Sequence, residues 1–199
     1  SEYTFRSLNS LISSLNLAKK HFPNIQLEII IVDHNSNKSD LDQINKQLNK
    51  INIKSSVVSL NVNEFKDQIE KINAKKENVT ANQLSNMCNI YKSFLIANER
   101  CSDLIYFVED DYIHKHEGIG EMILTYERIS SQINKELILC PIDYPYLYSK
   151  MDSTNIFLGD KMHWRSVDET LCTFLTSKII LKKYWEKLTS MCLFEHYPF

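Results

Sequence analysis

Glycine is scarce in this sequence, with 3 residues in 199. They are Gly118, Gly120 and Gly159, and none belongs to a P-loop or to a GxGxxG segment behind an apolar run. The backbone cradles with which many proteins hold a diphosphate are therefore excluded. The negative charge of a diphosphate bound here would need to be balanced in another way, and a metal ion is the most direct means.

An excess of positive charge is also missing. Lys and Arg number 23 against 25 Asp and Glu, and no basic stripe is visible, so nucleic acid is not an expected partner. No apolar stretch approaches the roughly 18–20 residues that a bilayer span requires, and no signal peptide opens the chain. Ser1 is followed almost at once by a helical pattern, so we expect a fragment of a longer protein.

The cysteines show no paired spacing. There are five, at Cys88, Cys101, Cys140, Cys172 and Cys192, and no CxxC pair occurs. An odd, widely spaced set argues against a disulfide framework or a zinc ribbon. We expect free thiols in a reducing, cytoplasmic setting, with peripheral membrane attachment through other segments left open.

Helical and strand patterns alternate along the chain. Apolar spacing predicts helices at 5–21, 41–49 (capped by Ser39 and Asp40), 80–100, 120–133 and 177–190. Strands are expected at 25–33, 54–60, 104–108 and 137–142, with shorter ones at 155–158 and 170–176. This order predicts an α/β fold with a mixed, mostly parallel, Rossmann-like sheet flanked by helices.

Acidic residues stand at the ends of two predicted strands. Asp33 closes the strand at 25–33, and Glu109, Asp110 and Asp111 follow the strand at 104–108. Because ligands of open α/β sheets bind outside the carboxyl ends of the strands, we expect both groups to face one crevice. Three adjacent acids repel one another, and a divalent cation is their natural compensator. The alternative is that they cap a turn and face solvent.

The segment from Ile29 to Asn37, an apolar strand followed by Asp-x-x-Ser, resembles family 2 glycosyltransferases. The segment from Asn86-Met87-Cys88-Asn89 through Ala97, which leads into Phe107-Val108-Glu109-Asp110-Asp111, is similar to that family's helix and following DxD-type motif. The resemblance covers about residues 1–140. It implies the GT-A nucleotide-diphospho-sugar transferase fold, here lacking its first strand or carrying it upstream.

The resemblance also implies residue roles on the donor side. Asp33 and Ser36 would contact the nucleotide, with uracil the favoured base. Glu109 and Asp110 would lie by the ribose and diphosphate, and Asp111 would bind Mn²⁺ or Mg²⁺. The family often adds a late histidine ligand. Here the candidate for it is His196.

The acceptor side needs a carboxylate that takes a proton from a hydroxyl in an inverting transfer. Asp168 and Glu169 are the candidates, with Asp143 in reserve, and Trp164 is expected to stack on a sugar. Tyr144, Tyr146 and Tyr148 line an acceptor groove or pack internally, and the segment His114–Glu117 is expected to be a surface loop. A retaining mechanism stays open.

Together these patterns predict a metal-dependent glycosyltransferase. Residues 1–142 would bind a nucleotide sugar, a UDP-sugar being favoured, and residues 143–199 would face a glycan or another hydroxyl acceptor. One alternative is a nucleotidyltransferase of similar fold, which the scarcity of glycine disfavours. The other is a non-catalytic domain that binds a glycan or nucleotide.

Overall fold

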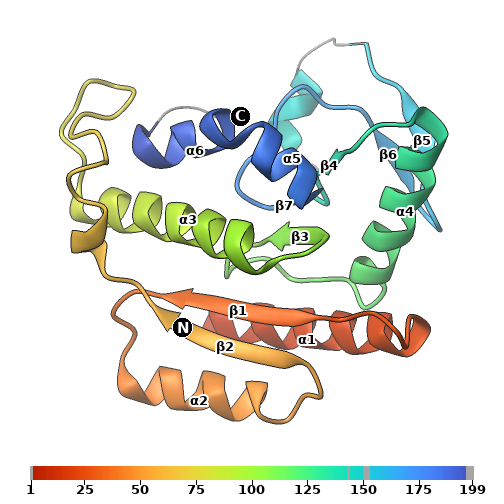
Figure 1. Ribbon diagram of the computed structural model, residues 1–199, viewed down its shortest axis with the longest axis horizontal. Coiled ribbons are helices and arrows are strands. Elements are labelled where there is room, and N and C mark those ends of the chain that lie inside the picture. Colours follow the sequence, from red (N-terminus) through yellow and green to blue (C-terminus); the bar gives the residue numbers. More distant parts are fainter. Residues whose placement is uncertain (1, 143, 150–152, 196–199) are drawn as a thin grey trace. The chain divides into compact units, whose positions relative to one another are not determined.

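The computed structural model describes residues 2–142, 144–149 and 153–195, and it has a mixed α/β fold (Figure 1). The chain forms two compact units. The first comprises Ser1–Ile25 and Leu104–Ile180, and the second comprises Gln26–Asp103 and Leu181–Phe199. The expected division near residue 142 concerns which ligand each part contacts, and it stays a prediction. Among the described residues, no helix has both the length and the apolar character that crossing a membrane requires.

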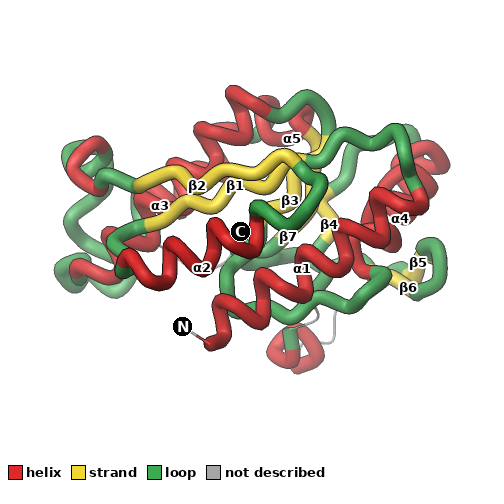
Figure 2. The backbone as a smooth tube through the Cα atoms, turned by 90° about the horizontal axis from the view of Figure 1, so that it is seen from below, coloured by secondary structure: helices red, strands yellow, loops and turns green. Residues whose placement is uncertain are grey.

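The second unit is built on a parallel pair of strands. β1 (Glu28–Asp33) and β2 (Lys54–Ser59) pair in register from Glu28 beside Lys54 to Asp33 beside Ser59, and Figure 2 shows them side by side. α2 (Lys38–Leu48) connects them and packs on β2. α3 (Ala81–Arg100) packs on β1 and on α6 (Trp185–Leu193).

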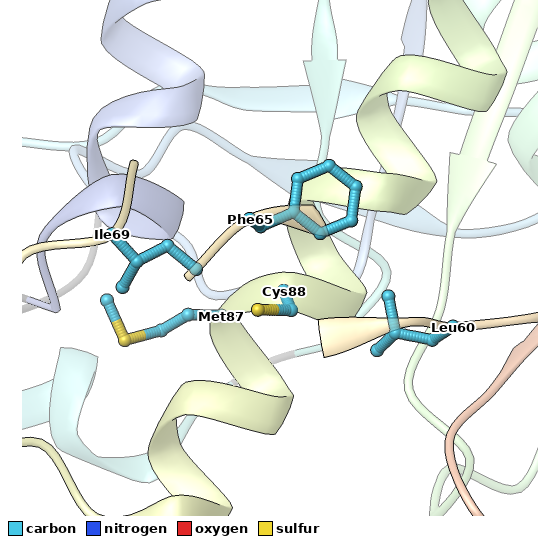
Figure 3. Packing of buried hydrophobic residues seen from close by; sticks show 5 residues of the cluster. All are labelled: Leu60, Phe65, Ile69, Met87 and Cys88. Carbon is cyan, nitrogen blue, oxygen red and sulfur yellow. The ribbon is translucent and has the colours of Figure 1, made fainter. Parts of the chain in front are cut away.

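The start of α3 has a strong local signal. Thr80 Oγ1 accepts a hydrogen bond from the Gln83 backbone N–H at 3.2 Å, and Gln83 Oε1 accepts one from the Thr80 N–H at 2.8 Å. This capping box satisfies donors that the first turn leaves open. The segment before it begins with the short 3₁₀ helix η1 (Val62–Glu64). The segment contributes Phe65 and Ile69 to a cluster of buried apolar residues (Figure 3). The other members of the cluster are Leu60, Met87 and Cys88.

The first unit combines an antiparallel sheet with a helix pair. β3 (Leu104–Phe107) and β4 (Ile138–Leu139) flank β7 (Phe174–Ser177), and both run antiparallel to it. β7 is buried along its whole length, as expected for the central strand. α1 (Glu2–His21) packs on α4 (Gly118–Ile133). η2 (Pro145–Ser149) precedes a hairpin of β5 (Ile156–Leu158) and β6 (His163–Arg165).

The expected α/β class is confirmed, but the sheet differs from the prediction. Among the described residues, three small sheets form, and only β1 and β2 pair in parallel. A buried apolar run predicts that a strand is covered on both faces, but it does not fix the direction of its neighbour. β6 was not expected from the sequence.

Several boundaries also differ. Asn37, rather than Ser39 or Asp40, caps α2, since its Oδ1 accepts the Asp40 N–H at 2.8 Å. The expected helix at 177–190 is divided into α5 (Lys178–Lys183) and α6. The division falls at Tyr184, whose φ of -112° and ψ of 25° leave the helical region and whose side chain is exposed. The strand expected at 137–142 is only two residues long, and the one at 170–176 begins at Phe174.

Candidate functional site

The three acids after β3 lie in two different environments. Glu109 is half-buried and turned back towards β7, where its backbone N–H donates to Thr173 Oγ1 at 3.2 Å and its Oε2 accepts from the same hydroxyl at 3.3 Å. Asp110 and Asp111 are exposed. The segment therefore places one carboxylate inside the fold and two at the surface.

The two exposed acids line an open hollow together with the first turn of α1. Its lining residues are Tyr3, Thr4, Asp110 and Asp111, and its volume is about 500 Å³. Thr4 Oγ1 donates a 2.7 Å hydrogen bond to Asp110 Oδ2, which fixes that carboxylate against the helix. The hollow is the size of a small-molecule site, and the charged groups that line it are carboxylates.

Negative charge accumulates around Glu109. Burial raises the pKa of its carboxyl, and the neighbouring charge of Asp111 raises it further. Burial raises the pKa of the Cys172 thiol to about 12, with a smaller effect from Glu109. The pKa of Tyr112, which shares a 3.2 Å hydroxyl contact with Tyr144, is raised mainly by burial as well. A positive charge placed near the acids would lower the pKa of each of these groups.

The loop that follows the acids is held on α1 by serines. Ser10 Oγ accepts the His114 backbone N–H at 2.9 Å, Ser13 Oγ lies 2.9 Å from His116 Nδ1, and Ser14 Oγ accepts the Ile119 N–H at 2.9 Å. His114 also places its Nε2 3.0 Å from the Tyr106 hydroxyl, and burial lowers the pKa of its imidazole. This segment is thus a docked loop rather than a purely solvated one.

The carboxylate oxygens of these acids suit a hard cation that also binds the oxygens of a ligand. Mg²⁺ and Mn²⁺ commonly bind one or two protein carboxylates and complete their shell with phosphate oxygens and water. In the described part of the chain, no group of three or more His, Cys, Asp or Glu is arranged to hold a metal by itself. The exposed pair Asp110 and Asp111 fits the shared arrangement. His196, the second expected ligand, lies outside the described residues.

Asp33 and Ser36 lie in a turn of the second unit at the end of β1. The Ser36 backbone N–H donates to Asp33 Oδ2 at 3.3 Å, and Asn35 between them adopts a left-handed φ of 59°. α3 holds this turn by two side chains, since Asn89 Nδ2 donates to Val32 O at 2.9 Å and Ser85 Oγ lies 2.6 Å from His34 Nδ1. The prediction that Asp33 shares a crevice with the acids after β3 stays a prediction.

Asp168 and Glu169 lie in the loop between β6 and β7. Asp168 is exposed and Glu169 is half-buried, and both line a second, smaller hollow beside η2. The indole N–H of Trp164 donates to Glu121 Oε1 at 3.1 Å, and its expected role at a sugar stays a prediction. Asp143, the reserve candidate, lies outside the described residues.

Glu121 was not anticipated from the sequence, although it is the most strongly hydrogen-bonded carboxylate among the described residues. It is buried on α4 and accepts five hydrogen bonds, from the backbone N–H groups of Asp160, Lys161 and Met162 and from the side chains of Thr125 and Trp164. These donors hold its pKa below the usual value despite burial. The sequence feature that could have revealed Glu121 is its place on the apolar face of an amphipathic helix, because a buried acid requires hydrogen-bonding partners.

Comparison with protein-family models, curated proteins and solved structures gives no match. The functional argument therefore depends on the residues and their geometry. Two surface regions of the first unit carry it. One is the hollow at Asp110 and Asp111, and the other is the hollow at Asp168 and Glu169.

Proposed function

We propose that the protein is a metal-dependent glycosyltransferase that moves a sugar from a nucleotide-diphospho-sugar to a hydroxyl acceptor with inversion. The observation that carries the proposal is the pair of exposed carboxylates Asp110 and Asp111 in an open hollow at the end of β3. Behind them, the pKa of the half-buried Glu109 is raised by burial and by Asp111. Such a site favours a cation and, through it, a diphosphate.

Each residue has a distinct role on the donor side. Asp111 would hold Mn²⁺ or Mg²⁺, which supplies positive charge to the departing nucleoside diphosphate. Asp110 and Glu109 would lie by the ribose and diphosphate, with Thr4 holding Asp110 in place. Asp33 and Ser36 would contact the nucleotide, for which a uracil base is favoured, and the Asx-type turn between them supports a fixed carboxylate at that position.

The transfer itself needs a base on the acceptor side. The acceptor oxygen forms a bond to the anomeric carbon as the bond to the diphosphate breaks and its electron pair leaves with the diphosphate. Asp168 or Glu169 would accept the proton of the acceptor hydroxyl. Both lie on a loop beside a hollow, which is compatible with contact to a bound acceptor.

The test is calorimetric titration of UDP with and without Mn²⁺. The variants are Asp111→Asn and, as a matched control, Asp103→Asn, which changes an exposed carboxylate just before β3. We expect UDP to bind only with the metal, Asp111→Asn to weaken binding at least tenfold, and Asp103→Asn to have no effect. Metal-independent UDP binding that is equal in wild type and Asp111→Asn would refute the metal role.

Product analysis separates the alternatives. A glycosyltransferase incubated with a UDP-sugar releases UDP, whereas a nucleotidyltransferase joins a sugar phosphate to a nucleoside triphosphate and releases pyrophosphate. A binding domain releases neither. UDP release that depends on Asp111 supports the proposal, and pyrophosphate release or no turnover with every donor sugar contradicts it.

A further inference from the structure

Residues 108–113 form a loop that begins where β3 ends and carries Asp110 and Asp111, and we call it the acid loop. None of its residues belongs to a helix or a strand, so side-chain contacts have to hold it. The two ends of the loop meet at one contact. The Tyr106 hydroxyl lies 3.0 Å from His114 Nε2, and the two rings pack edge to face with their centroids 5.7 Å apart. This contact closes the acid loop at its base.

The helix α1 holds His114 from another side. Ser10 Oγ accepts the His114 backbone N–H at 2.9 Å, donates to Ser7 O at 2.7 Å and lies 3.4 Å from His114 Nδ1. Because the hydroxyl proton of Ser10 is used on Ser7, Nδ1 carries the ring proton and donates it towards Ser10. Nε2 is then an acceptor, and the Tyr106 hydroxyl donates to it. One neutral tautomer of His114 therefore satisfies both contacts.

The surroundings of His114 favour this neutral form. The residue is half-buried, and burial lowers the pKa of its imidazole from the ordinary value of 6.5. The titratable group that faces it from β3 is Tyr106, whose pKa is raised by burial, and α1 presents the Ser10 hydroxyl, which does not titrate. Among the described residues, no carboxylate forms an ion pair with this imidazole. A proton on His114 therefore disfavours the closed loop.

We propose that His114 is a positioning residue that regulates the metal site of the acid loop. Its neutral imidazole, held between β3 and α1, closes the loop and keeps Asp111 in place for a divalent cation, while Asp110 has its own anchor in Thr4. A loop that is ordered before the cation arrives binds it more tightly, because less ordering has to accompany binding. When His114 gains a proton, the closed loop is weakened and the affinity for the cation falls. The inference rests on the proposed function, since it requires that Asp111 binds a metal.

Binding of Mn²⁺ alone tests the inference, measured by the loss of the electron paramagnetic resonance signal of the free ion. The variants are Tyr106→Phe, which keeps the ring and removes the hydroxyl, and His114→Gln, which cannot be protonated. His116→Gln is the matched control, because His116 is an exposed histidine of the same segment with Ser13 as its partner. At pH 7.5 we expect both variants to bind Mn²⁺ about fivefold more weakly than the wild type, as for one lost hydrogen bond, and the control to bind equally well. Thermal melting without metal checks that each variant is folded.

The pH profile separates a positioning role from a purely structural one. Protonation of the acids weakens Mn²⁺ binding in every variant, so the ratio of the wild-type affinity to that of His114→Gln isolates the contribution of the histidine. Because the neutral imidazole is lost as pH falls through its lowered pKa, this ratio should fall from about five towards one between pH 7.5 and pH 4.5. A ratio that stays constant over this range overturns the inference.

Asp111→Asn, measured in the same way, distinguishes this inference from the proposed function. If it loses Mn²⁺ binding while Tyr106→Phe and His114→Gln bind as the wild type does, the inference is refuted and the metal site stands. If Asp111→Asn binds Mn²⁺ as the wild type does, or if the wild type binds none, the proposed metal site is refuted and the role of His114 with it.

Discussion

The substitution Glu121→Gln tests the buried carboxylate of α4. Oε1 accepts four of its five hydrogen bonds, and Oε2 accepts the Lys161 N–H at 2.8 Å. The least damaging orientation of a glutamine puts its amide nitrogen in the place of Oε2, where it opposes the Lys161 donor. One donor loses its partner, and the other four lose the charge that strengthened their bonds.

The expected loss of unfolding free energy is about 2–4 kcal/mol, combining one unsatisfied buried donor with four weakened bonds. Urea unfolding followed by circular dichroism at pH 7 measures it. Glu127→Gln is the matched control, because it makes the same change at an exposed position of α4 and should stay within about 0.5 kcal/mol of wild type. A Glu121→Gln variant as stable as Glu127→Gln would show that the five bonds do not stabilise the fold.

The pH dependence of this stability has a definite sign. The donors hold the folded-state pKa of Glu121 below its usual value of 4.5. The ionised carboxylate therefore stabilises the fold above the unfolded-state pKa, and this contribution is lost as pH falls through the lowered folded-state pKa. The gap between wild type and Glu121→Gln should be widest near neutral pH and should narrow in acid. A gap that widens in acid would contradict the assignment.

Three further perturbations follow from single contacts. Gly159→Ala places a methyl group against Glu121 Oε1 and Thr125 Oγ1, so urea unfolding should show a loss of about 1–3 kcal/mol, and an unchanged midpoint would count against the close packing. Asn89→Ala removes the hydrogen bond to Val32 O and should cost about 1 kcal/mol, whereas Asn86→Ala, exposed on the same helix, should cost little. Because burial raises the pKa of the Cys172 thiol, its alkylation at pH 8, read by mass spectrometry, should be slower than that of an unperturbed cysteine and should rise about tenfold per pH unit. Alkylation of Cys172 at pH 8 as fast as that of an unperturbed cysteine would refute the raised pKa.

Local signals were enough to predict most helices and the placement of the acids. The helix at 80–100 was predicted from apolar spacing, and α3 begins at Ala81, one residue after the predicted start. The run at 104–108 is apolar and short, so both a strand there and the position of Glu109 just after its end were expected. These features depend on neighbours within a few positions, which a sequence displays directly.

Long-range pairings were not predictable in this way. The antiparallel partner of β3 is β7, about seventy residues later, and no periodicity in either strand records that direction. The orientation of Trp164 depends on a carboxylate 43 positions away on α4, and the residues near Trp164 in the sequence do not indicate that contact.

Two carboxylates of the first unit show how a structural acid differs from one suited to a ligand. Glu121 is buried, yet five donors lower its pKa, so its charge is compensated by the protein itself and needs nothing else. The pKa of Glu109 is raised, chiefly by burial and then by the negative charge of Asp111, and the hydrogen bond from Thr173 offsets this only in part. The fold thus compensates one acid fully and leaves excess negative charge around the other. A cation binding at Asp111 would lower the pKa of Glu109, because the charge of Asp111 raises it. The acids after β3, and not Glu121, are therefore the place to look for a ligand.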